Sequence, residues 1–186
     1  MSKMEFDEID YKILQSLQDD AGISNVELAD RVGLSAAPCL RRVSALESAG
    51  ILRKYVALLN PVAVDLAVTV FVQISLDLQV DKRLDIFENA VMKRPEIVEC
   101  YLMTGDADYL LRVVVPDVAA YERFLKESLT RIEGVASIKS SFALKQVKYS
   151  TALPLTRGAT AESANKQRES VGRVNLEQRR RRNQPE

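Results

Sequence analysis

The segment from Ser24 to Leu52 constrains the fold most, because it carries two helix-start signals one short turn apart. Ser24 and Glu27 form an S-x-x-E capping box, in which the hydroxyl binds the amide of the third helical residue and the carboxylate returns to the cap amide. Gly33 supplies the positive φ that a sharp corner requires, and Ser35 is positioned to cap a second helix. Two short helices joined by such a turn predict a helix-turn-helix, whose second helix can enter the major groove of DNA.

The second helix, which we expect to end near Ala49, has a division of residue types that suits a DNA reader. Leu40, Val43 and Leu46 recur at spacings of three and are predicted to face the core. The other positions are small or basic, and an arginine can bind phosphate or pair bidentately with guanine. An ordinary helix pair with a solvated face is the alternative interpretation. The predicted DNA-contacting residues are Ser35, Ala36, Ala37, Cys39, Arg41 and Arg42.

Composition excludes several classes of protein. With 186 residues and 47% hydrophobic residues, the chain is long enough for one or two small domains with real cores. It has no apolar run of membrane-spanning length, and its charged N-terminus lacks a signal segment, so we expect a cytoplasmic, nucleoid-associated protein. Histidine is absent, which removes the commonest general base, and the spacing of Cys39 and Cys100 matches no metal site. We therefore predict a protein that is not an enzyme and holds no metal or cofactor.

The net charge is zero, but its distribution is uneven. Residues 1–60 hold 7 Lys/Arg against 9 Asp/Glu, and residues 157–186 hold 8 against 4. Between Ser24 and Lys54 the balance is 5 basic to 3 acidic residues, enough for a modest basic face only. Such a weak phosphate-binding surface favours an assembly that adds several half-sites together.

Three regions follow from the residue patterns. Residues 1–60 are predicted to form the helix-turn-helix domain, with a first helix over 7–18 and an extended wing or exit strand over 51–60. Residues 61–156 show strands over 68–76, 97–103, 109–115 and 135–147, and helices from Asp81 to Met92 and after the cap residue Asp117. Residues 157–186 are polar, end in the arginines Arg179 to Arg182, and are predicted to form a disordered basic tail that either binds nucleic acid or is dispensable.

The element order of the second domain, βαββαβ, predicts a ferredoxin-like fold. In that arrangement both helices cover one face of an antiparallel sheet, so the other face is solvated or buried against a partner. Phe71 would lie on the uncovered face among smaller polar residues, which suggests dimerisation through the sheet. The overall fold class is therefore α+β, with an N-terminal winged helix-turn-helix and a C-terminal ferredoxin-like domain.

Four segments in this order resemble the Lrp/AsnC family, the feast/famine transcriptional regulators of bacteria and archaea. They correspond to the family's opening helix, recognition helix with the start of the wing, central β-hairpin, and final strand with its exit. The segments are D-E-I-D-Y-K-I-L-Q-S-L at 7–17, residues 34–52, T-G-D-A-D-Y-L-L-R-V-V-V-P-D at 104–117, and residues 134–155. The tail after Leu155 departs from the family pattern, and nothing is carried onto it.

The resemblance implies a winged-helix DNA reader joined to a domain that senses small molecules. Members of the family dimerise through their sheets, assemble further into tetramers or octamers, and bind amino acids or related metabolites in clefts between dimers. Effector binding then shifts the assembly state or the affinity for DNA. The chain is therefore expected to bind double-stranded DNA and an amino-acid effector, and to have no membrane partner.

The effector site is expected near the hairpin. Asp108 could accept from the ammonium group of an amino acid, while backbone amides near Gly105 could hold its carboxylate. The remaining predicted residues would shape the pocket or reach it from the last strand. The predicted set is Tyr101, Met103, Thr104, Gly105, Asp106, Asp108 and Ser140. A plain hairpin turn with a solvated Asp108 is the alternative.

Three further hypotheses stay open. An enzyme would have to use Asp106 and Asp108 as an acid–base or weak cation site, although no further ligand cluster is visible. A stand-alone amino-acid-sensing module would use the helix pair for protein contacts only. An architectural protein would bind DNA without any effector.

Overall fold

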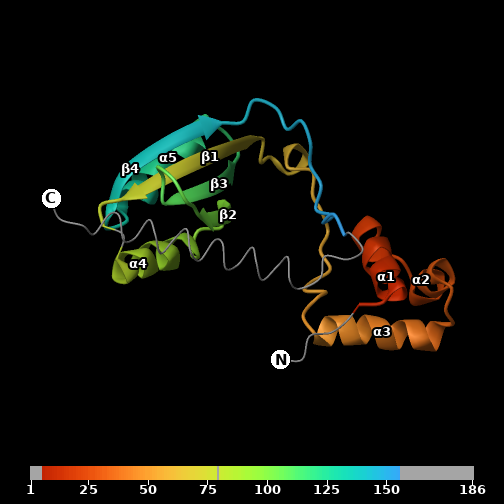
Figure 1. Ribbon diagram of the computed structural model, residues 1–186. Coiled ribbons are helices and arrows are strands. Elements are labelled where there is room, and N and C mark those ends of the chain that lie inside the picture. Colours follow the sequence, from red (N-terminus) through yellow and green to blue (C-terminus); the bar gives the residue numbers. More distant parts are fainter. Residues whose placement is uncertain (1–5, 79, 156–186) are drawn as a thin grey trace. The chain divides into compact units, whose positions relative to one another are not determined.

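The computed structural model describes residues 6–78 and 80–155 and separates them into two units (Figure 1). Unit one contains the described residues up to Leu58 together with those from Lys148 onward. Unit two spans Leu59–Val147. The predicted tail, with Arg179 to Arg182, lies outside the described residues.

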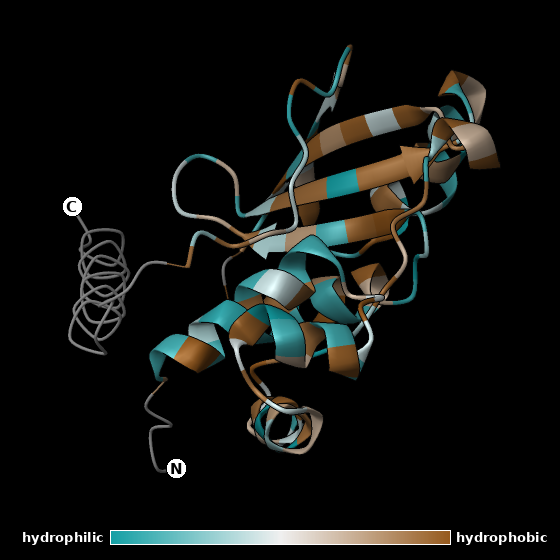
Figure 2. Cartoon of the chain, turned by 90° about the vertical axis from the view of Figure 1, so that its right-hand side faces the viewer, coloured by the Kyte–Doolittle hydropathy of each residue, from teal (hydrophilic) through white to brown (hydrophobic). Residues whose placement is uncertain are grey.

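Unit one is built from α1 (Glu8–Asp19), α2 (Asn25–Val32) and α3 (Ala36–Ser48). Asp7 starts α1 with a capping box of its own, because its side chain accepts from the Asp10 amide while the Asp10 side chain accepts from the Asp7 amide. Figure 2 shows bands of hydrophilic and hydrophobic residues alternating along the helices, as expected where one stripe of a helix faces a core. The buried core of the unit consists of Ile13, Leu14, Leu17, Leu28, Ala29, Val32, Cys39 and Leu46.

The chain returns to unit one after leaving the sheet. The Gln18 side chain accepts from the Leu153 amide at 2.6 Å and donates to the Leu153 carbonyl at 3.3 Å. Leu155 packs against the helical core. The second domain predicted from the sequence extends to residue 156, whereas residues 148–155 group with unit one, through contacts with residues far away in the sequence.

Residues 53–60 have no regular secondary structure and form no strand pairing within the described chain. The Tyr55 hydroxyl donates to Glu47 Oε1 of α3 at 3.0 Å. Of the two alternatives for this segment, a wing or an exit strand, a β-paired wing is therefore not formed within the described residues.

Unit two has the predicted order β1 (Val68–Leu76), α4 (Asp81–Val91), β2 (Ile97–Leu102), β3 (Tyr109–Val115), α5 (Val118–Glu127) and β4 (Val135–Phe142). Short 3₁₀ turns lie at Val62–Val64 and Leu129–Arg131. The four strands form one antiparallel sheet in the order β2-β3-β1-β4. This arrangement is the ferredoxin-like fold expected from the element order.

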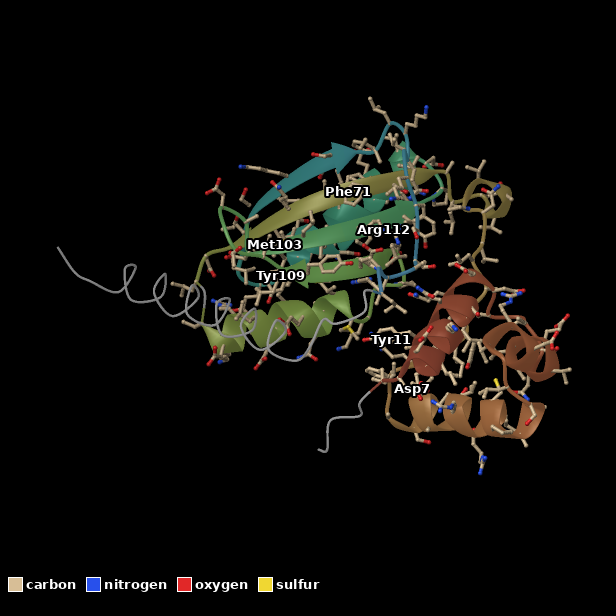
Figure 3. The ribbon with its side chains drawn as sticks, turned by 45° about the vertical axis from the view of Figure 1, so that its right-hand side comes forward. Asp7, Tyr11, Phe71, Met103, Tyr109 and Arg112 are labelled. Carbon is tan, nitrogen blue, oxygen red and sulfur yellow. The ribbon has the colours of Figure 1, made fainter. Side chains whose placement is uncertain are left out.

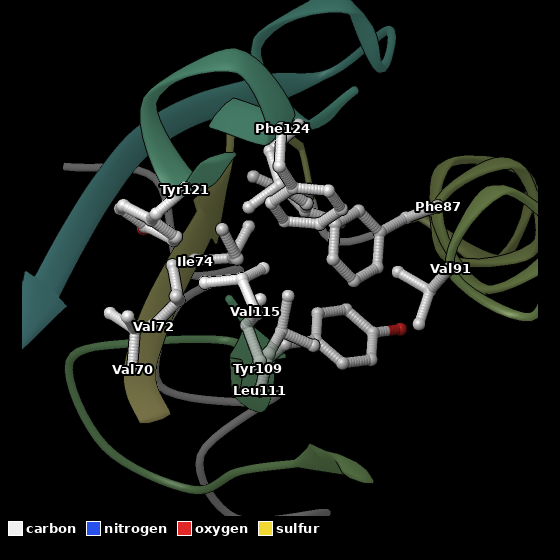
Figure 4. Packing of buried hydrophobic residues seen from close by; sticks show 13 residues of the cluster. Val70, Val72, Ile74, Phe87, Val91, Tyr109, Leu111, Val115, Tyr121 and Phe124 are labelled. Atoms are coloured by element: carbon white, nitrogen blue, oxygen red, sulfur yellow. The ribbon is translucent and has the colours of Figure 1, made fainter. Parts of the chain in front are cut away.

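The helices cover one face of this sheet. Val70, Val72 and Ile74 of β1 are fully buried, and they pack in one cluster with Phe87 of α4 and Phe124 of α5 (Figure 4). The rings of Phe87 and Tyr109 lie 4.5 Å apart, and the Tyr109 hydroxyl donates to Glu88 at 2.8 Å. The hydroxyl of the buried Tyr109 therefore has a hydrogen-bond acceptor.

The strand bounds agree with the predicted ones for β1 and β3, but β4 ends earlier than expected. It pairs only with β1, and its last pair is Phe142 with Val70, followed by a bond from the Ala143 amide to Thr69. In this register Val68, the first residue of β1, would lie opposite Leu144, so the chain beyond Leu144 has no strand to pair with. The chain leaves the sheet after Ala143.

Candidate DNA-binding and effector sites

The corner between α2 and α3 is held by local hydrogen bonds. Gly33 has φ 75° and ends α2, with its amide bonded to the Asp30 carbonyl at 3.2 Å. The Leu34 amide reaches the Ala29 carbonyl at 2.8 Å, which closes the turn in the way a left-handed residue after a helix allows. The Asn25 side chain donates to the Ala36 carbonyl at 2.9 Å and so fixes the start of α3. The predicted helix-turn-helix is therefore formed.

One face of α3 is open to solvent from its first turn onward. Ser35, Ala36 and Ala37 are exposed, and Arg41 follows them on the same helix. Arg41 is exposed and makes no hydrogen bond or ion pair with any described residue. Ser35 occupies the cap position as predicted, although its side chain makes no capping bond. This face combines small residues, which allow close approach, with a free guanidinium that can bind phosphate or guanine.

Two of the predicted DNA contacts are corrected by the structure. Cys39 is fully buried, and burial raises the pKa of its thiol, so it is a neutral core side chain. Arg42 is held within its own unit, with Nη1 2.7 Å from Asp7 Oδ2 and 2.8 Å from Asp10 Oδ1. Asp7 is labelled in Figure 3 at the start of α1. Arg42 therefore joins α3 to α1.

The core stripe of α3 is also rotated relative to the prediction. Leu40 is 54% exposed, whereas Cys39 and Leu46 are fully buried and Val43 packs against them. Cys39, Val43 and Leu46 follow the spacing of four and three residues, which is equally compatible with a helix. Leu40 thus joins Arg41 on the exposed side.

The hairpin between β2 and β3 carries most of the predicted effector residues. Thr104, Gly105 and Asp106 form its exposed turn, where Gly105 adopts φ 117°. Tyr101 and Met103 are 52% and 43% exposed and lead into the turn. Met103 is labelled in Figure 3 near this end of the sheet. All five residues are exposed, and we call them the hairpin surface.

Asp108 does not belong to that surface. Its side chain is buried, at 7% exposure for the residue, and Oδ2 accepts from the Leu76 amide at 2.7 Å. The carboxylate thus ties the end of the hairpin to β1. The predicted contact with an ammonium group is corrected accordingly, because a desolvated carboxylate that is already hydrogen-bonded serves the fold.

Ser140 is likewise separated from the hairpin within one chain. It pairs with Val72 on the helix-covered side, and its hydroxyl lies 2.5 Å from the Tyr121 hydroxyl. Tyr101 lies opposite Leu110 on the other side of the sheet, and β2 and β4 are opposite edges. A single chain therefore does not bring Ser140 and Tyr101 together.

The uncovered face of the sheet is mixed in character. Phe71 is 40% exposed there and lies opposite Arg112 of β3 (Figure 3). Arg112 forms an ion pair with Glu99 of β2, with Nη2 and Oε1 2.6 Å apart. Glu99 also accepts from the Tyr101 hydroxyl at 3.2 Å, and this bond raises the pKa of Tyr101. An apolar ring beside an internally neutralised pair suits a surface that meets a partner.

Across the part of the chain that the structure describes, no three His, Cys, Asp or Glu side chains gather in a way that would hold a metal ion. Within residues 6–78 and 80–155, no helix is long and apolar enough to cross a membrane.

A helix-turn-helix unit next to a ferredoxin-like domain defines a class of two-domain transcriptional regulators. Residues 6–53 match the family of winged helix-turn-helix DNA-binding domains, and residues 69–153 match the Lrp/AsnC ligand binding domain. The chain belongs to the Lrp/AsnC family of DNA-binding transcriptional regulators.

The matches span almost the whole length of several relatives. The Bkd operon transcriptional regulator of Pseudomonas aeruginosa is 49% identical over 151 residues, covering 81% of this chain and 99% of that protein. The leucine-responsive regulatory protein of Escherichia coli is 46% identical over 149 residues, covering 80% and 91%. Both relatives are regulators by name.

Solved structures agree with the fold. A transcriptional regulator from Neisseria meningitidis, crystallised as a complex with L-Met, has a TM-score of 0.79 at 42% identity and covers 82% of this chain and 98% of its own. An AsnC family transcriptional regulator from Agrobacterium tumefaciens has a TM-score of 0.77 at 48% identity and covers 81% and 97%.

Proposed function

We propose that α3 reads a specific DNA sequence through Ser35, Ala36, Ala37 and Arg41. The observation that carries this proposal is the contrast between the two neighbouring arginines. Arg42 is neutralised within the unit, whereas Arg41 is exposed and has no partner among the described residues. A charged side chain held free beside a row of small residues has the geometry for contact with base edges or phosphates.

Arg41→Ala tests this proposal in a fluorescence anisotropy titration with a duplex selected by the wild-type protein from a random-sequence library. Loss of a base contact by an arginine costs about 1–3 kcal/mol, so the expected loss of affinity is about tenfold or more. Lys12→Ala is the control, because Lys12 is a cation on α1 already paired with Glu8. Equal affinities of Arg41→Ala and wild type for the selected duplex would contradict the proposal.

We propose further that an amino acid is the effector of the second unit and that it binds at the exposed hairpin surface of Tyr101, Met103, Thr104, Gly105 and Asp106. A ligand-binding domain in the family match supports a small-molecule effector. The names of two relatives, a leucine-responsive protein and a complex with L-Met, favour an apolar amino acid. Tyr101 and Met103 supply a surface suited to such a side chain.

A thermal-shift screen of the full chain against the twenty amino acids tests the effector site. An amino acid that stabilises the wild type should no longer stabilise Met103→Asp, in which a charge replaces part of the apolar wall. Met92→Asp is the matched control, because Met92 is 85% exposed and lies at the end of α4. If no amino acid stabilises the wild type, an effector-independent architectural role becomes the better hypothesis.

We also propose that the chain assembles through the uncovered sheet face and acts in the cytoplasm at the nucleoid. An effector bound between dimers would stabilise the assembled form that contains its site, and so would change the spacing of the DNA-reading helices. Phe71→Glu should lower the mass measured by light scattering, because it places a charge in the proposed interface. Met92→Glu should leave the mass unchanged, and an unchanged mass for Phe71→Glu would contradict this interface.

A further inference from the structure

A cleft lies in unit two, away from the hairpin. It has a volume of about 590 Å³ and is lined by residues from α5, from the 3₁₀ turn that follows it, and from the turn between α4 and β2. A volume of this order is typical of sites for small molecules. None of the hairpin residues proposed above lines it. The charged residues in its wall are Arg94, Glu96, Arg123, Glu127 and Arg131.

None of these five charged side chains forms a hydrogen bond or ion pair with another described residue, and four of them, all but Glu96, are exposed. By contrast, Arg42, Arg83 and Arg112 each form an ion pair within their own unit. Charged groups that line a cleft without a hydrogen bond or ion pair to one another are available for a ligand.

Glu96 gives the second observation. Its Oε2 atom is buried and has no hydrogen-bond partner among the described residues. A buried carboxylate oxygen without a donor is costly, and it therefore points to a group that is supplied from outside the chain. The required group is a donor N–H or O–H, and an ammonium group satisfies the charge as well.

From these two observations we infer that this cleft binds an acidic amino acid, a ligand with two carboxylates and one ammonium group. Three guanidinium groups exceed two carboxylates by one positive charge in the wall, which complements the single net negative charge of such a ligand. Guanidinium groups bind carboxylates through paired N–H donors, and Glu96 accepts from the ammonium group. Val115 and Phe124, which are buried, also line the cleft and add an apolar surface.

Isothermal titration of the full-length protein with four probes tests the inference. L-glutamate should bind about tenfold or more tightly than 2-oxoglutarate, which lacks the ammonium group, and than L-glutamine, which lacks the second carboxylate. Inorganic phosphate should bind more weakly than L-glutamate. Arg123→Gln should weaken L-glutamate binding about tenfold or more, and Glu96→Gln should remove the preference over 2-oxoglutarate.

Lys93→Gln is the matched control, because it removes a cation next to Arg94 that does not line the cleft, and it should bind L-glutamate as the wild type does. Met103→Asp should also retain this binding, since the inference does not depend on the hairpin site. The inference is overturned if L-glutamate does not bind, if phosphate binds equally well, or if Arg123→Gln and Glu96→Gln have no effect. Loss of L-glutamate binding in Met103→Asp alone would assign the ligand to the hairpin and overturn it as well.

Discussion

Replacement of Arg42 by alanine is expected to destabilise the helical unit instead of removing a DNA contact. The Arg42 guanidinium lies within 2.8 Å of Asp10, whose side chain is only 7% exposed. Without Arg42, the Asp10 carboxylate stays largely desolvated and keeps only its capping bond from the Asp7 amide. Hydrogen bonds to charged groups contribute about 1.5–3 kcal/mol. The ion pair with Asp7 adds little, because the Asp7 side chain is 52% exposed. We therefore expect Arg42→Ala to lower the free energy of unfolding of the helical unit by about 2 kcal/mol.

Hydrogen exchange measured by mass spectrometry on the full chain provides a local assay. A loss of about 2 kcal/mol corresponds to roughly 30-fold faster exchange in peptides from α1 and α3. Peptides from β1 and β3 should be unaffected, because they belong to the other unit. Arg41→Ala is the matched control, and it should weaken DNA binding without changing exchange.

Arg42 and Asp10 should behave as one interacting pair. In a double-mutant cycle, the loss of unfolding free energy in the variant that combines Asp10→Asn with Arg42→Ala should be smaller than the sum of the losses in the two single variants, since each single change removes the same interaction. Wild-type exchange in Arg42→Ala, together with a loss of DNA affinity equal to that of Arg41→Ala, would refute a structural role for Arg42.

Three further predictions concern single positions. Gly33→Ala should lower the free energy of unfolding, measured in urea, by about 1 kcal/mol. An added Cβ would meet no atom within 4 Å, so only the φ of 75° is unfavourable. A decrease of several kcal/mol would contradict this expectation. Asp108→Ala should lower the free energy of unfolding by about 1.5–3 kcal/mol. Asp108→Asn should lower it less, because the oxygen of the Asn side chain can still accept from the Leu76 amide. Equal decreases for the two variants would argue against a stabilising role of the hydrogen bond from Leu76. The pKa of Asp7 lies below its usual 3.8, chiefly because its carboxylate accepts from the Asp10 amide. The ionised Asp7 therefore stabilises the fold fully above pH 3.8, and this contribution is lost as the pH falls through the lowered pKa. Asp7→Asn should therefore flatten the acid side of the stability profile, and an unchanged profile would exclude this contribution.

Local signals predicted most of the elements. The capping boxes and Gly33 act within four residues of themselves, so the helix-turn-helix was readable before any tertiary contact was known. The alternation in β1 and the apolar run of β3 reflect burial against one layer of helices, and both strands have the bounds that were predicted. The early end of β4 could not be predicted in this way, because it depends on where its partner strand begins.

The rotation of α3 shows the limit of periodicity. Stripes that begin at Leu40 or at Cys39 share Val43 and Leu46, and both fit a helix. Packing against α1 and α2 selected the stripe with Cys39, since its small side chain is fully enclosed there. That choice turned Leu40 outward and removed Cys39 from the predicted DNA surface.

Hydrophobic period, helix caps and turns act over short stretches of chain, and they predict the two domains, their element order and the family. Which charged groups are paired depends instead on tertiary contacts. Arg42 meets Asp7 across 35 positions and Asp108 meets the Leu76 amide across 32, so both are committed to the fold. Arg41 and the five charged residues of the cleft have no such partners among residues 6–78 and 80–155. Whether a charge is paired depends on neighbours brought together by folding, and no local pattern contains that information.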